Sequence, residues 1–180
     1  PFVGEVPLGV PLGDVIRDLA GGVKSGRAVK AVLSGISNGA LTAEYLETPL
    51  DYEALREAGG GLGSAGFIVF DETRNMVDVA ARYSRFLHVE SCGQCNPCKA
   101  GTREITIGME ALVEGDVSQD PLDRIARATQ TVTDGSRCFL PTQAMIVSSS
   151  ILRSFPEDVA ERSSGVPGTH SVPLPLIIGI

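Results

Sequence analysis

The sequence predicts an α+β fold, with a small sheet module over residues 1–72 and a bundle of four helices over residues 73–162. Three observations predict it. Short apolar runs alternate with glycines in the first part, and apolar residues at helical spacing fill the second. All four cysteines fall between predicted helices. With 180 residues, 43% of them hydrophobic, the chain can bury a core for one ordinary domain or two small ones.

Three strands and one helix are expected in the first part. Residues 2–8 read as a strand, and residues 11–19 place apolar side chains at helical spacing before two glycines. Residues 28–33 and 66–70 are apolar runs typical of strands, the second reached through the glycine-rich residues 59–66. A strand, helix, strand, strand order predicts a small module with the helix packed on one sheet face.

Four helices are predicted from residue 73 onward, each by apolar residues recurring every three or four positions. Thr73 is expected to cap the first, Gly115 to end the second, Asp120 with Pro121 to begin the third, and Pro141 to open the fourth. The residues expected to face inward are, in chain order, Met76, Ala80, Tyr83 and Leu87; Ile105, Met109 and Leu112; Leu122, Ile125, Ala126, Thr129 and Val132; and Ala144, Val147, Ile151 and Phe155.

The cysteines form one pattern. Cys92, Cys95 and Cys98 are separated by two residues each, and Cys138 stands alone forty positions later. Bacterial ferredoxins use the same C-x-x-C-x-x-C run to hold corners of a four-iron, four-sulfur cluster. The helical bundle should bring the two interhelical links that carry these residues together at one end. The pattern therefore predicts a [4Fe–4S] site with all four cysteines as ligands.

Other cysteine chemistry fits the spacing less well. A structural zinc site usually has two separated C-x-x-C pairs, whereas three cysteines overlap here on one short span. A disulfide has little support, because no charged segment followed by an apolar one indicates secretion. A structural or docking module that holds zinc, or a cluster without turnover, stays open as the alternative function.

Composition limits the partners. A net charge of −7 and a pI of about 4.8 argue against nucleic-acid binding, which needs a basic surface. No stretch approaches the roughly 20 apolar residues of a membrane span, so direct membrane insertion is not expected. The first residue is not Met, and a Gly-, Ser- and Pro-rich stretch precedes an apolar end. We therefore expect a segment of a longer polypeptide, with residues 163–180 as a linker or tail.

Residues 90–102, with their C-x-x-C-x-x-C run, closely resemble the iron–sulfur signature of the NADH-binding flavoprotein subunit of respiratory complex I, of NAD-linked hydrogenases and of NAD-dependent formate dehydrogenases. Residues 62–72 look like that family's strand leading into its helical bundle, and residues 6–12 resemble the start of its β-grasp domain. Cys138 matches the family's fourth ligand. Lys99 departs from the family, which usually has arginine after the third cysteine.

The resemblance implies a ubiquitin-like β-grasp module over residues 1–72 followed by an iron–sulfur bundle. It implies an electron-transfer domain of an NADH:acceptor oxidoreductase, which relays electrons from FMN to iron–sulfur carriers on other subunits. FMN and NADH are expected on a preceding domain, since this chain shows no dinucleotide-binding fingerprint. A cytoplasmic location, or a peripheral one on the cytoplasmic face of a membrane complex, follows from the same likeness.

Overall fold

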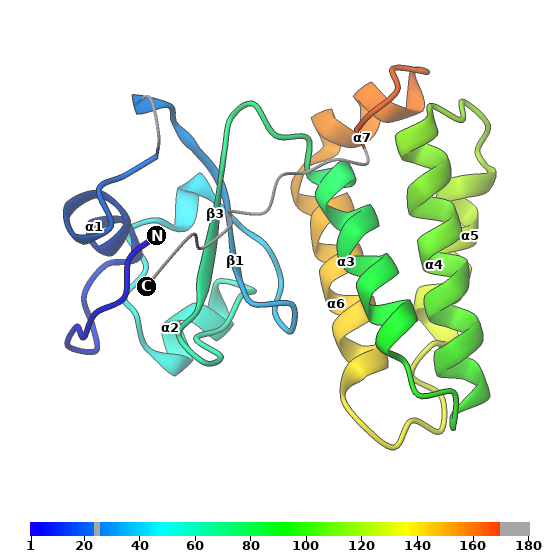
Figure 1. The fold of residues 1–180 in the computed structure, drawn as a ribbon, viewed down its shortest axis with the longest axis horizontal. Coiled ribbons are helices and arrows are strands. Elements are labelled where there is room, and N and C mark those ends of the chain that lie inside the picture. Colours follow the sequence, from blue (N-terminus) through cyan, green and yellow to red (C-terminus); the bar gives the residue numbers. More distant parts are fainter. Residues whose placement is uncertain (24–25, 170–180) are drawn as a thin grey trace. The chain divides into compact units, whose positions relative to one another are not determined.

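The structure is a computed structural model that describes residues 1–23 and 26–169. The chain divides into two compact units, the first from Pro1 to Arg74 and the second from Asn75 onward. Figure 1 shows a small sheet with short helices in the first unit and long helices in the second. The α+β class is as predicted. The expected strand within residues 170–180 lies outside the described residues.

The sheet of the first unit has three antiparallel strands in the order β2-β1-β3. These are β1 (Val29–Ser34), β2 (Leu41–Thr42) and β3 (Phe67–Asp71). In the central strand, Val32 pairs with Leu41 on one side and with Val69 on the other. The strands predicted over residues 28–33 and 66–70 are confirmed, whereas β2 is too short to give a signal in the sequence.

A helical segment packs into the core of this unit, as predicted. It consists of α1 (Leu12–Asp14) and the π-helical η1 (Val15–Leu19). Further along, η3 (Ala43–Tyr45) and α2 (Tyr52–Glu57) were not predicted. The buried core combines apolar side chains from the helices, the sheet and the loops: Leu12, Ile16, Val32, Leu41, Leu50, Leu55 and Leu62.

The prediction of a strand over residues 2–8 is wrong. This stretch has no ladder partner among the described residues, and Val3 is 98% exposed. The chain pairs only a little later, where Gly9 N donates to Leu50 O and Leu50 N donates to Val10 O, at 3.2 and 2.9 Å. Pro7 has no backbone N–H to donate, which limits how far a ladder can extend toward the N-terminus.

Helices make up the described part of the second unit: α3 (Met76–Glu90), α4 (Asn96–Glu114), α5 (Asp120–Thr131), α6 (Leu140–Ser154) and α7 (Pro156–Ser163). Helix α4 packs against α3 and α5, and α3 also packs against α6, as Figure 1 shows. The predicted inward positions of the fourth helix are all buried: Ala144, Val147, Ile151 and Phe155. No helix in the described ranges combines the length and the apolar composition that crossing a bilayer requires.

Three details of the helices differ from prediction. The cap of α3 is Asn75, whose side chain accepts from Val77 N, because Thr73 is engaged with Asp71 instead. On α5, Ala126 is exposed and Ala128 is buried in its place. The short helix α7 follows α6 after a single residue and was not predicted separately.

Two glycines let α4 and α5 approach closely. A Cβ on Gly108 would lie 2.6 Å from Ile125 Cγ1 and 2.8 Å from Pro121 O. A Cβ on Gly101 would lie 2.8 Å from the Val132 side chain. Such distances are far below van der Waals contact, so the interface depends on the absence of side chains at both positions.

Candidate metal centre

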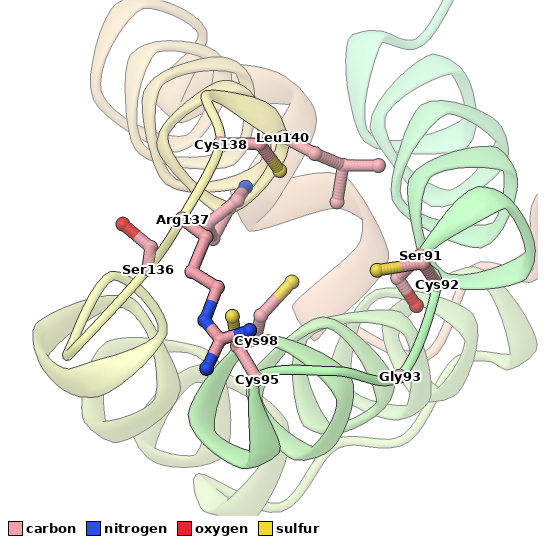
Figure 2. Close-up of a pocket in the computed structure, with 10 residues that line it drawn as sticks. Ser91, Cys92, Gly93, Cys95, Cys98, Ser136, Arg137, Cys138 and Leu140 are labelled. Carbon is pink, nitrogen blue, oxygen red and sulfur yellow. The ribbon is translucent and has the colours of Figure 1, made fainter.

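One pocket of the second unit gathers all four cysteines of the chain. It encloses about 270 Å³ of empty space, open solvent included, and Figure 2 shows the four sulfur atoms arranged around a shared space. It is lined by residues from two separate segments: Ser91, Cys92, Gly93, Cys95 and Cys98, and Ser136, Arg137, Cys138, Leu140 and Pro141. The structure therefore brings together the two segments that the sequence predicted would meet.

The first segment turns sharply from α3 into α4. Ser91 caps the end of α3 by donating its hydroxyl to His88 O, and Gly93 adopts a φ of +80°, which glycine accepts without strain. Helix α4 then begins with Pro97 in its first turn, a position that suits proline because no N–H is needed there. The short turn places Cys92 before the bend and the next two cysteines after it.

The cysteines of this segment differ in setting. Cys92 is exposed, Cys95 is the N-cap of α4, and Cys98 is buried in the first turn of the helix. Sequence reasoning placed Cys98 in the link between helices. That placement is wrong, because Pro97 starts the helix one residue earlier. The helix fixes the backbone at Cys98 and directs its side chain toward the pocket.

The second segment is the link between α5 and α6. Cys138 lies in this link, as predicted, and is exposed. Pro141 stands in the first turn of α6. Cys98 and Cys138 thus lie at the starts of two long helices, α4 and α6, where unpaired backbone N–H groups carry partial positive charge. This position favours thiolates and anionic ligands.

The four thiols also act on one another electrostatically. Burial raises the pKa of the Cys98 thiol, and the charges of the other three cysteines raise it further, while Lys99 acts in the opposite direction. A group of thiolates that repel one another is stabilised by cations among them, and metal binding releases the protons. The donor set of four thiols around one pocket therefore fits an iron–sulfur cluster.

A single ion is not what the geometry resembles. Within the described residues, no three His, Cys, Asp or Glu side chains stand close enough together to hold one metal ion. The cysteine sulfurs instead surround a wider space (Figure 2). Ligands of a cluster bind different iron atoms, so their sulfurs lie further apart than the four ligands of one tetrahedral zinc ion.

Lys99 reaches over the end of α3. Its ammonium donates to His88 O at 2.9 Å and to Ser91 O at 3.0 Å. These carbonyls lie at the C-terminal end of a helix, where a cation is favoured. An ammonium with freely placed donors suits two carbonyls that do not form a planar fork. Lys99 thus holds the start of the cysteine loop.

His88 lies in the last turn of α3, as predicted, and does not line the pocket. Its Nδ1 lies 3.3 Å from Thr102 Oγ1, and the Thr102 hydroxyl donates to Cys98 O at 2.8 Å. Burial lowers the pKa of His88, and the positive charges of Lys99 and Arg103 lower it further. The imidazole is therefore neutral at physiological pH and links α3 to α4 at the back of Cys98.

Several lining residues were not singled out from the sequence. Ser136, Arg137 and Leu140 flank the fourth cysteine, and their closeness to Cys138 in the chain was the available signal. Of these, Arg137 brings a charge to the pocket.

The comparisons with known proteins place this geometry in a family. Residues 78–162 match the NADH-ubiquinone oxidoreductase-F iron-sulfur binding region. The corresponding NADH-quinone oxidoreductase subunit of Rickettsia felis is 34% identical over 163 residues, which are 89% of this chain and 39% of that subunit. NADP-reducing hydrogenase subunit HndC of Solidesulfovibrio fructosivorans is 36% identical over 137 residues, 76% of this chain and 28% of that subunit.

A solved structure agrees. The crystal structure of an NAD+-reducing [NiFe]-hydrogenase in the H2-reduced state matches with a TM-score of 0.73 and 32% identity, covering 87% of this chain and 26% of that one. The chain thus spans less than two fifths of the length of the relatives described above, which are oxidoreductase subunits. By its cysteine signature, its fold and these matches, the chain belongs to the family of the NADH-ubiquinone oxidoreductase-F iron–sulfur binding region.

Proposed function

We propose that this chain carries one [4Fe–4S] cluster, with Cys92, Cys95, Cys98 and Cys138 as its ligands, and relays electrons within an NADH-oxidising complex. One observation supports the proposal above all others: the only four cysteines of the chain, from two distant segments, line one pocket. When bound, such a cluster takes up and releases one electron at a time. The exposed Cys92 and Cys138 lie at the solvent side, where electrons can pass to a partner.

The rest of the chain has supporting roles in this proposal. Residues 73–162 form the four-helix iron–sulfur bundle, residues 1–72 form a β-grasp module of the kind that binds soluble ligands, and residues 163–180 act as a linker or tail. The α4–α5 and α3–α6 contacts hold the two cysteine segments against each other, so the protein and the cluster stabilise one another.

The complete oxidoreductase is proposed from the relatives. Their names describe NADH-quinone oxidoreductase and hydrogenase subunits, so we propose that FMN and NADH bind a preceding domain of the parent protein. Electrons then pass from FMN through this cluster to iron–sulfur carriers on other subunits. The proposed location is the cytoplasm, or the cytoplasmic face of a membrane complex.

Metal analysis tests the site directly. The full chain, reconstituted without oxygen with iron and sulfide, is expected to contain about four irons and four sulfides. Replacing any one of the four cysteines by serine should reduce this content strongly. Ser136→Ala is the matched control, because Ser136 lines the same pocket without a thiol. One zinc per chain with no sulfide would support the structural alternative and contradict the proposal.

Reduction tests the relay. Dithionite should bleach the absorbance of the loaded chain and produce an electron paramagnetic resonance signal. A loaded chain that stays silent after reduction would contradict electron transfer, even if four irons are present.

A further inference from the structure

Arg137 is the residue of the pocket that carries a permanent positive charge. It precedes Cys138 directly and lines the pocket together with the four cysteines. Figure 2 shows its side chain reaching from the α5–α6 link across toward Cys95 and Cys98. Within the part of the chain that the structure describes, its guanidinium makes no hydrogen bond and no ion pair. Its charge is therefore not neutralised by a carboxylate in that part of the chain.

The second cation beside the cysteines is used differently. Lys99 does not line the pocket, and its ammonium is held by the carbonyls of His88 and Ser91. Its charge is the smallest of the influences on the Cys98 thiol. The two cations thus have separate tasks: Lys99 fixes the loop, and Arg137 faces the space between the sulfurs.

We propose that Arg137 raises the reduction potential of the cluster by placing an unneutralised guanidinium in the cysteine pocket. The inference rests on the proposed function and goes beyond it, because it assigns the tuning of the potential to a residue that is not a ligand. Reduction adds an electron to a centre that four thiolates already make anionic, so a nearby cation stabilises the reduced state more than the oxidised one.

Arginine suits this role for two reasons. Its guanidinium stays protonated at every physiological pH, so the effect does not depend on titration. Its fork of N–H groups can also donate to sulfur, and such hydrogen bonds are among the factors that set iron–sulfur potentials. Because Arg137 is exposed, water and salt weaken the charge effect without abolishing it.

A potentiometric titration of the loaded full chain, followed by electron paramagnetic resonance, tests the proposal. Arg137→Gln should lower the midpoint potential by about 59 mV, which corresponds to a tenfold shift of a one-electron equilibrium. Arg137→Lys, which keeps the charge, should retain most of the wild-type potential. Arg153→Gln is the matched control, since Arg153 is exposed in the last turn of α6, far along that helix from Cys138.

The outcomes separate this inference from the proposed function. A full cluster with an unchanged midpoint in Arg137→Gln would overturn the inference alone, as would an equal shift in Arg153→Gln. A wild-type chain that binds no iron and sulfide would overturn both. If Arg137→Gln and Arg137→Met both lose the cluster while Arg137→Lys keeps it, the charge is needed for binding, and the tuning role is overturned.

Discussion

The carboxylate of Asp78 and the guanidinium of Arg162 form a two-pronged ion pair that joins the first turn of α3 to α7. Arg162 Nε lies 2.7 Å from Asp78 Oδ1 and Nη2 lies 2.9 Å from Oδ2, with side chains only 7% and 5% exposed. The backbone N–H of Thr169 also donates to Asp78 Oδ2 at 3.0 Å. The pair closes the unit at the start of α3, whereas the cysteines follow its end.

Breaking this pair should destabilise the protein strongly. Asp78→Asn leaves the buried guanidinium of Arg162 without its counter-charge, and we expect a loss of about 3–5 kcal/mol in the free energy of unfolding, measured by urea denaturation. Asp123→Asn, at an exposed position of α5, is the matched control and should change little. Equal stabilities of the two variants would show that the ion pair is not needed.

A methyl group on Gly108 should separate α4 from α5. Alanine is the better helix former by about 1 kcal/mol, so Gly108→Ala would stabilise an isolated helix. The steric conflict with Ile125 and with Pro121 O should outweigh this gain and lower the free energy of unfolding by about 1–3 kcal/mol. Thermal and urea unfolding decide the sign: a stabilised variant would mean that the interface yields easily.

Removing the ammonium of Lys99 should loosen the cysteine loop. Lys99→Met leaves the carbonyls of His88 and Ser91 without their charged donor, and hydrogen bonds to charged groups contribute about 1.5–3 kcal/mol. We expect lower thermal stability and faster amide exchange around residues 91–95. Lys99→Arg, which keeps a cation, serves as the comparison. Unchanged exchange in Lys99→Met would contradict a role in holding the loop.

The cysteine ligands could be predicted from the sequence because their spacing alone restricts the geometry. The apolar spacing likewise located α3, α4 and α6, whose inward faces bury large side chains. Both signals are local, and each survives whatever the rest of the chain does.

Other features depend on contacts between distant residues. Asn75 caps α3 in place of Thr73 because Asp71 already binds the Thr73 hydroxyl and N–H. The strand expected over residues 2–8 had suitable apolar residues but no partner to pair with. Arg137 joined the site only once the packing of α4 and α6 had brought its link to the other cysteines. Local patterns carry no record of such competition.

The histidine beside the pocket should make the stability depend on pH. Burial and the charges of Lys99 and Arg103 lower the pKa of His88 from its ordinary 6.5, so the unfolded chain takes up the proton first as the pH falls. The free energy of unfolding is therefore retained above pH 6.5 and lost as the pH falls through the folded-state pKa. His88→Gln removes this proton uptake. Urea denaturation of the reduced, metal-free full chain should show wild type losing stability relative to His88→Gln between about pH 7 and about pH 5. Parallel pH profiles of the two proteins would contradict a depressed pKa at His88.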